Sequence, residues 1–119
     1  MVREKFKFET LEVYQRAQSL VKHIYLTSRD WPKEYLFDLT AQLRRAALSV
    51  MLNIAEGSGR SKKEFGHYLD IARGSCNESV ALIDLASQLG LFSRNQTDSF
   101  LSELSEIARM LSGLKRSLR

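Results

Sequence analysis

The sequence predicts an all-α protein in which four amphipathic helices form an up-down-up-down bundle. Four segments carry apolar residues at three- and four-residue steps, and no segment alternates apolar and polar residues as a half-buried strand does. Six glycines and a single proline are too few for a disordered chain or an all-β fold. The connections between the four segments are short, so consecutive helices are expected to run antiparallel.

Length and composition predict one domain covering residues 1–119. The net charge of +4 and the pI of about 9.4 permit nucleic-acid binding without requiring it. The N-terminal residues lack the apolar core of a signal peptide, and no apolar run is long enough to span a membrane. Cys76 is the single cysteine, which excludes an internal disulfide framework. We therefore expect a cytoplasmic protein.

The first helix is expected to begin near Thr10 as its N-cap, with Phe8 before it as a hydrophobic staple. It should end between residues 28 and 31, because Pro32 disfavours helix at the residue before it. The connection over residues 31–37 contains aromatic side chains that could cover one end of the core. The apolar stripe of this helix consists of Leu11, Tyr14, Ala17, Val21 and Ile24.

The second helix, over residues 39–57, is apolar on two faces, and the run Gly57-Ser58-Gly59 ends it. The inner face consists of Leu39, Leu43, Ala46, Val50 and Ile54. The opposite face consists of Ala41, Leu48, Met51, Leu52 and Ala55. A surface helix needs only one apolar stripe, so another part of the chain or another copy must cover the second. Self-association is therefore the first functional hypothesis, with Leu48, Met51, Leu52 and Ala55 as the candidate oligomer interface.

The third helix opens with Ser61 and Glu64 at the spacing of a capping box, and Gly90 is its expected stop. Its inner stripe consists of Phe65, Leu69, Ala72, Cys76, Val80 and Ile83, and its flanking stripe of Ile71, Leu82, Leu85 and Leu89. Gly74 lies inside this helix, where glycine costs about 1 kcal/mol relative to alanine. Close approach of another backbone is the expected reason for it.

The fourth helix is expected to be capped by Asn95 or Thr97. Its apolar residues follow a heptad pattern, which predicts a single seam facing the core. They are Phe100, Leu104, Ile107, Leu111, Leu114 and Leu118.

The second helix also carries a specific motif. Residues 39–47 read LTAQLRRAA, and residues 53–57 read NIAEG. Other agreeing residues follow in the same order: Phe8, Leu11, Val13, Ala17, Trp31-Pro32, Gly59-Arg60, Glu64-Phe65, Ala72, Gly74-Ser75 and Glu78. Over residues 8–91 the chain resembles the four-helix-bundle proteins encoded within intervening sequences of bacterial 23S ribosomal RNA genes.

The resemblance implies small bundles that assemble into homopentameric rings. Related bundle proteins accompany reverse transcriptases in diversity-generating retroelements, where the family implies contacts with the enzyme and with nucleic acid. This sequence departs from the family pattern at Met51 and Leu52, where a proline and a small residue are common, and at Asp38, where glycine is common. The first departure predicts a straighter second helix with a larger outer apolar face.

Basic residues at three places are candidates for nucleic-acid binding. Arg44 and Arg45 could contact phosphate, or they could form ion pairs at a subunit contact, for example with Glu56 of a neighbouring copy. We favour the ion pairs because arginine is enriched at interfaces. The other candidates are Arg60, Lys62 and Lys63 at the start of the third helix, and Lys115, Arg116 and Arg119 at the end of the chain. Both groups could attract phosphate, but exposed charge runs are more often simply solvated.

The remaining polar residues do not form a catalytic constellation in the sequence. Asn53 could fix the register of an oligomer or hydrogen-bond within its own bundle. His23 and His67 lack partners at metal-ligand spacing, and Cys76 is expected to be a core residue. Trp31 and Tyr35 could stack on bases but more readily cover the bundle end. We therefore expect no catalytic residue, metal or cofactor.

Together these features predict a non-enzymatic, homo-oligomeric scaffold that presents basic surface to RNA or DNA. The alternative is a protein-interaction adaptor, such as a reverse-transcriptase accessory protein, in which helix faces bind a protein partner.

Overall fold

Four α-helices account for most of residues 3–119, the part of the chain that the computed structural model describes. They are α1 (Glu12–Ser28), α2 (Ala41–Ser58), α3 (Lys62–Gln88) and α4 (Arg94–Ser117). A 3₁₀ turn, η1 (Lys7–Thr10), precedes α1. A 3₁₀ turn, η2 (Lys33–Tyr35), and a π-helical turn, η3 (Leu36–Thr40), lead into α2. The described residues contain no strand, in agreement with the predicted all-α class.

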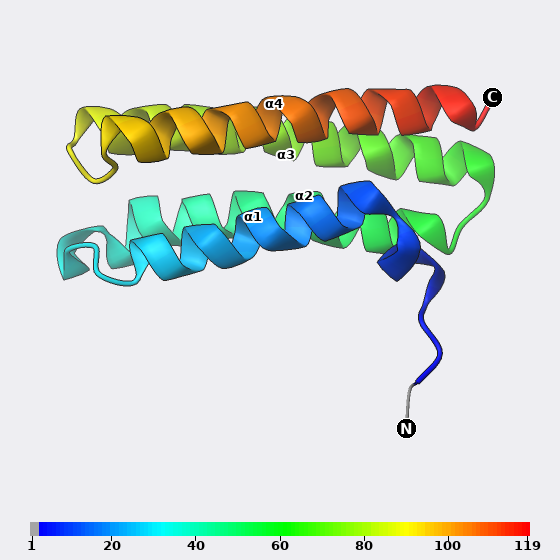
Figure 1. Cartoon of the computed structure of the whole chain (residues 1–119), viewed down its shortest axis with the longest axis horizontal. Coiled ribbons are helices and arrows are strands. Elements are labelled where there is room, and N and C mark those ends of the chain that lie inside the picture. The colour runs from blue at the N-terminus through cyan, green and yellow to red at the C-terminus, as the bar shows by residue number, and fades with distance from the viewer. Residues whose placement is uncertain (1–2) are drawn as a thin grey trace.

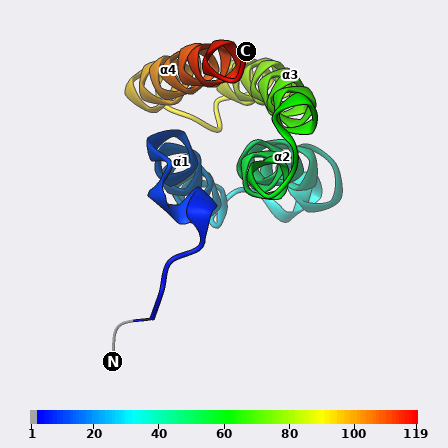
Figure 2. The same ribbon diagram turned by 90° about the vertical axis from the view of Figure 1, so that its right-hand side faces the viewer.

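Each helix runs antiparallel to the next along the chain (Figure 1). Seen end-on, α1, α2, α3 and α4 follow one another around the bundle, so α4 returns beside α1 (Figure 2). The helix pairs α1–α2, α2–α3, α3–α4 and α1–α4 are in contact. Arg16 of α1 ties α1 to α4 through an ion pair with Glu103 at 3.1 Å. The predicted up-down-up-down bundle is confirmed.

The core lies along the axis between the four helices and is formed mainly by the predicted inner stripes. Its fully covered large side chains include Leu20, Ile24, Leu43, Val50, Ile54, Leu69, Ile83, Leu104, Ile107 and Leu111. One prediction for α3 is wrong. Val80 is 37% exposed, whereas its neighbour Ser79 is fully buried and donates a hydrogen bond to the Ser75 carbonyl at 2.8 Å. Because that bond satisfies its hydroxyl, the small polar side chain can occupy the inner position.

Two predicted helix starts are also wrong. The N-cap of α1 is Leu11 and not Thr10, because Thr10 lies in η1 and its hydroxyl donates to the Lys7 carbonyl at 2.7 Å. The N-cap of α4 is Ser93 rather than Asn95 or Thr97. Ser93 and Gln96 form a complete capping box, with bonds of 2.9 and 3.1 Å between each side chain and the other residue's backbone N–H. The Ser61 cap of α3 is confirmed, since Ser61 Oγ accepts from the Glu64 backbone.

Three glycines differ in backbone conformation and in the space around them. Gly90 has φ +77° and closes α3, with the Leu91 N–H bonding to the Ala86 carbonyl at 2.9 Å. A Cβ added at Gly74 would meet no neighbour within 4 Å, so the expected close approach there is absent. The close approach occurs at Gly57, where a Cβ would lie 2.6 Å from Tyr68 Cβ.

The aromatic residues at the α1–α2 connection divide into two groups. Trp31 packs edge-on against Phe92 with ring centroids 4.9 Å apart, and Tyr35 is half-buried against the core. These two side chains cover the bundle end, as expected. Phe37 is 92% exposed and does not contribute to that cover. Within residues 3–119, no helix combines the length and the apolar character needed to cross a membrane.

Candidate functional site

The second apolar face of α2 is only partly covered by the chain itself. Leu48 and Met51 are half-buried against the edge of the core, and Ala41 and Ala55 are half-buried as well. Leu52 is 54% exposed. The helix is unbroken from Ala41 to Ser58.

The third helix extends this apolar surface. Ser75 Oγ donates to Ser49 Oγ at 2.7 Å, so Ser75 marks the side of α3 that meets α2. Ile71, Leu82 and Leu89 lie within about 40° of Ser75 on a helical wheel, on the flank beside the α2–α3 seam. Ile71 is 41% exposed and Leu89 is 47% exposed. We call the residues Ala41, Leu48, Leu52, Ala55, Ile71, Leu82, Leu85 and Leu89 the outer apolar face.

Charged residues of both signs accompany the outer apolar face. Arg45 lies about 60° from Leu48 on α2, and Glu78 lies about 40° from Leu82 on α3. Both side chains are exposed, and neither forms an ion pair with another of residues 3–119. Arg45 also lies within about 20° of Leu52, and Glu78 within about 20° of Ile71 and Leu89, so charges of opposite sign lie among the apolar residues of this surface.

Arg44 differs from Arg45 in being engaged within the chain. Its Nε donates to Ser28 Oγ at 3.0 Å, and its guanidinium lies 4.6 Å from the centroid of the Tyr25 ring. Through these contacts Arg44 connects the first turns of α2 with the end of α1. Arg45 is the member of this pair whose charge remains exposed to solvent or to a partner.

Arg60 lies at the turn between α2 and α3 and is also engaged. It pairs with Glu56 and lies 3.8 Å from a Glu64 carboxylate oxygen, with its guanidinium 5.5 Å from the Tyr68 ring centroid. The hydrogen bond to Glu56 raises the pKa of Arg60 above its ordinary value. The carboxylate of Glu56 is thus paired inside its own chain.

Asn53 belongs to a polar cluster on the α2–α3 seam. Its Nδ2 donates to the Ser49 carbonyl at 2.8 Å and to Ser49 Oγ at 3.0 Å, and Ser49 in turn accepts from Ser75. This chain of bonds fixes the relative position of α2 and α3. Of the two roles considered for Asn53, the structure shows hydrogen bonding within its own bundle.

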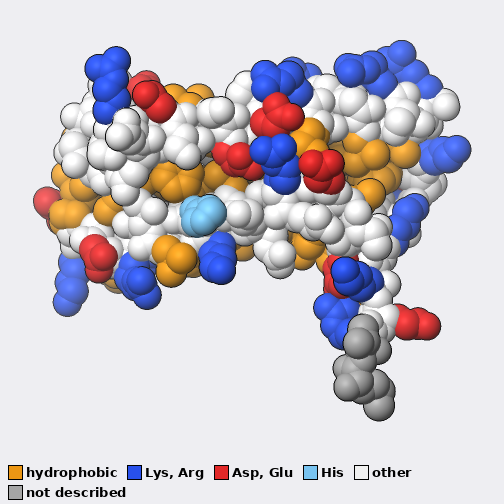
Figure 3. All heavy atoms as spheres, in the orientation of Figure 1, with side chains coloured by type: hydrophobic (Ala, Val, Ile, Leu, Met, Phe, Trp, Pro, Cys, Tyr) orange, Lys and Arg blue, Asp and Glu red, His pale blue; other side chains and the backbone are white. Residues whose placement is uncertain are grey.

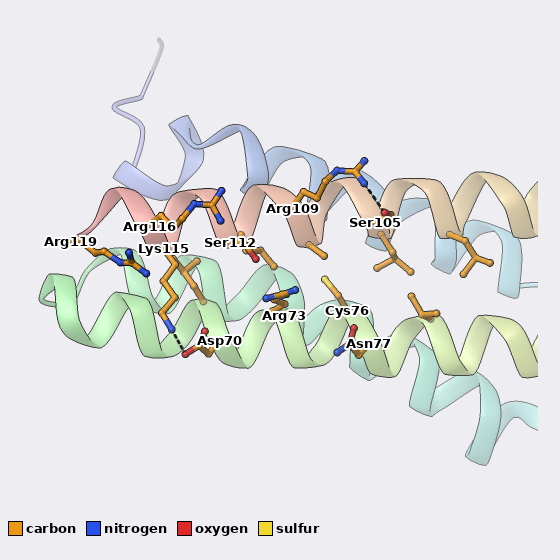
Figure 4. Close-up of a pocket in the computed structure, with 16 residues that line it drawn as sticks. Asp70, Arg73, Cys76, Asn77, Ser105, Arg109, Ser112, Lys115, Arg116 and Arg119 are labelled. Atoms are coloured by element: carbon orange, nitrogen blue, oxygen red, sulfur yellow. Dashed lines mark hydrogen bonds and ion pairs between the residues drawn. The ribbon is translucent and has the colours of Figure 1, made fainter.

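A basic groove of about 920 Å³ lies between α3 and α4 (Figure 4). Arg73 and Asn77 line it from α3, and Ser105 and Ser112 line it from α4. Its charged residues are Asp70, Arg73, Arg109, Lys115, Arg116 and Arg119. Five of the six charged residues that line the groove are therefore basic, although the side chains of Arg109 and Arg116 project from the side of α4 away from α3 (Figure 4). Figure 3 shows Lys and Arg side chains gathered over the end of α4 that lies nearest the C-terminus.

Two of these basic side chains are neutralised by neighbours. Lys115 Nζ bonds to Asp70 at 2.7 Å across the groove, and Arg109 bonds to Glu106 at 2.6 Å along α4. The hydrogen bond from Arg109 lowers the pKa of Glu106. The other three, Arg73, Arg116 and Arg119, are exposed and have no ion-pair partner in the described part of the chain.

The groove continues towards the first turn of α3. A neighbouring hollow of about 1010 Å³ shares Asp70, Lys115 and Arg119 with it and is also lined by Lys62 and Lys63. The structure thus brings the predicted basic residues of the start of α3 and of the end of α4 to one side of the bundle. Arg44, Arg45 and Arg60 lie elsewhere.

Sequence reasoning missed Arg73 and Arg109 as members of this groove. A signal for Arg109 was present, since Ser105, Arg109, Ser112, Arg116 and Arg119 recur at four- and three-residue steps on one face of α4. Arg73 gave no such signal. Its place opposite α4 depends on the register between the two helices.

The cysteine and the two histidines differ in their exposure to solvent. Cys76 is 1% exposed, and burial raises the pKa of its thiol to about 11. His23 and His67 are both exposed, on α1 and α3. Among residues 3–119 there is no group of three or more His, Cys, Asp or Glu side chains placed to hold a metal ion.

Comparison with known protein families identifies the family of this chain. A family model described as 23S rRNA-intervening sequence protein matches residues 9–113. The chain belongs to this family. A crystal structure of a protein of unknown function from the S23 ribosomal protein family of Bacteroides thetaiotaomicron superposes with a TM-score of 0.77. At 22% sequence identity the match covers 87% of this chain and 97% of the other, so the two folds agree over most of their length. A search of curated proteins found no match.

Proposed function

We propose that this protein is a non-enzymatic homo-oligomeric scaffold that presents a basic surface to RNA or DNA. The observation that carries the proposal is the outer apolar face, which spans α2 and α3 and leaves Leu52, Ile71, Leu85 and Leu89 between 41% and 54% exposed. Contiguous exposed apolar surface on a soluble protein marks an interaction site. A second copy of the chain is the proposed occupant.

Charge supports a second copy as that occupant. The outer apolar face carries Arg45 on its α2 part and Glu78 on its α3 part, and both are unpaired within residues 3–119. Two copies can satisfy each other's charges, whereas a partner of one sign would pair only one of them. The proposed number of copies is five, which comes from the family resemblance.

The nucleic-acid part of the proposal is supported by the net charge of +4 and by the basic side chains that gather on the α3–α4 side. The outer apolar face lies at the α2–α3 seam, so assembly through it leaves the α3–α4 groove accessible. One surface would then hold copies together while another contacts phosphate.

A charge introduced into the outer apolar face tests assembly. Leu52→Glu is expected to shift the solution mass measured by light scattering to that of a single chain, because an unpaired charge would have to be buried between copies. Leu26→Glu is the matched control, since Leu26 is 44% exposed on α1 away from this face, and it should leave the mass unchanged. Circular dichroism checks that both variants fold.

Equal masses for wild type and Leu52→Glu would contradict assembly through this face. A wild-type chain that is a single copy but captures one defined protein through Leu52 would support the adaptor function instead. Release of that protein by nuclease would indicate that nucleic acid bridges the two.

A further inference from the structure

We propose that the α3–α4 groove binds the phosphate backbone of a single nucleic-acid strand, without base specificity, through Arg73, Arg116 and Arg119. This inference rests on the proposed function and deepens it by assigning the site and the class of ligand. These three arginines are the groove's cations that no carboxylate within residues 3–119 neutralises.

The geometry of the groove concentrates positive charge. Arg73 comes from α3 and Arg119 from the end of α4, and both lie in the space between the two helices (Figure 4). Arg116 and Arg119 add unpaired positive charge at the C-terminal end of α4, opposite the part of α3 that carries Arg73. Charges of one sign along the walls of a hollow reinforce one another and raise the local concentration of an anionic ligand.

The groove's hydrogen-bond donors suit phosphate oxygens. A guanidinium presents a planar fork that binds phosphate with two parallel hydrogen bonds. Ser112 and Asn77 line the same space and carry the hydroxyl and amide groups that commonly contact phosphate. An acidic peptide shares the charge of a nucleic acid, but its carboxylates are irregularly placed, whereas phosphates recur at every nucleotide of a strand.

The shape of the groove favours a single strand over a duplex. Duplex recognition uses a projecting helix or ribbon that enters a groove of the DNA. Here the arginines line a hollow, which a single backbone can enter. The apolar lining of the groove includes Val80, Leu101, Leu104 and Ala108, and no aromatic side chain lines it. Because base stacking on aromatic rings is absent, binding should depend on the backbone and not on base identity.

The test measures binding of fluorescein-labelled oligouridine by fluorescence anisotropy over a salt series. The groove variant Arg73→Gln/Arg116→Gln/Arg119→Gln should weaken binding about 10-fold or more and reduce the salt slope, log K against log salt, by about 2. The matched control is Lys22→Gln/Arg29→Gln/Lys33→Gln, which removes the same charge from exposed residues of α1 and its connection. The control should retain most of the wild-type affinity and slope.

The outcomes separate this inference from the proposed function. Equal losses in the two triple variants would mean diffuse attraction, and would overturn the groove while leaving nucleic-acid binding in place. A wild-type protein that binds no strand would overturn both the groove assignment and the proposed nucleic-acid binding.

The class of ligand is tested separately. Tighter binding of a duplex of the same sequence, or full competition by polyglutamate at matched charge, would overturn the assignment of a single nucleic-acid strand. A mixed-sequence strand that binds as well as oligouridine would support it.

Discussion

Gly57 is the glycine at which packing leaves the least room for a side chain, because α2 meets α3 there. A Cβ there would lie 2.6 Å from Tyr68 Cβ and 2.9 Å from Phe65 Cδ1. Gly74, in the middle of α3, borders open space. Sequence periodicity identified both as glycines within or at the end of a helix but assigned close approach to Gly74. The two cases look alike in one sequence, because only the neighbouring helix distinguishes them.

Alanine substitutions at these two glycines should have opposite effects on the free energy of unfolding. Gly57→Ala should lower it by about 1–3 kcal/mol, because the added methyl overpacks the seam. Gly74→Ala should raise it by up to about 1 kcal/mol, because alanine is the better helix former and meets nothing. Urea denaturation of both variants measures this. Equal effects of the same sign would contradict the packing described at Gly57.

Cys76 should be unreactive in the folded protein. Burial raises the pKa of its thiol to about 11, so almost no thiolate forms at about pH 8. A thiol-specific reagent should therefore modify the native chain slowly and the urea-unfolded chain quickly. The thiol of the unfolded chain ionises at about pH 8.5, whereas the folded thiol stays protonated. The free energy of unfolding should therefore fall as pH rises from there towards the folded-state pKa of about 11. Rapid labelling of native protein at neutral pH would show that Cys76 is accessible.

At the scale of the element, the existence of each helix followed from apolar periodicity, whereas the exact starts of α1 and α4 did not. Thr10 was the expected cap of α1, and Asn95 or Thr97 was the expected cap of α4. Ser93 became the cap of α4 because Gln96 completes the reciprocal bonds, which Asn95 and Thr97 cannot do from inside the helix. The position of Thr10 was decided by η1, a short turn that periodicity does not reveal.

The cap of α4 can be tested at two nearby positions. Ser93→Ala should lower the free energy of unfolding by about 1 kcal/mol, because the Gln96 N–H loses its acceptor. Asn95→Ala should change it little, since Asn95 is exposed and lies inside the first turn. Thermal denaturation followed by circular dichroism compares the two. A larger loss at Asn95 than at Ser93 would contradict the observed cap.

At the scale of the whole molecule, function depends on how the helices are placed beside one another. The outer face of α2 was visible in the sequence because residues of one helix define it. Its continuation by Ile71, Leu85 and Leu89 of α3 depends on the seam fixed by Ser49 and Ser75. The α3–α4 groove likewise depends on the register of α3 against α4, across which Lys115 pairs with Asp70. The sequence of one chain does not reveal how its helices are aligned against one another. Only some residues of the outer apolar face and of the α3–α4 groove could therefore be predicted.

The same placement of helices explains why the two adjacent arginines of α2 have different roles. Arg44 faces α1, where Ser28 and Tyr25 engage it, and Arg45 faces outward beside the outer apolar face. Neighbouring residues of a helix point about 100° apart, so adjacent positions can belong to different surfaces. Arg45 would take part in assembly through the outer apolar face, whereas Arg44 would keep its contacts with Ser28 and Tyr25 of its own chain.

The most direct test is the solution mass of the wild-type chain, measured by light scattering across a concentration series at low and high salt. We predict one defined assembly of several copies that persists at high salt, because apolar contacts at Leu52 and its neighbours resist screening whereas surface ion pairs do not. A mass of 13.6 kDa, that of a single chain, at every concentration would contradict it.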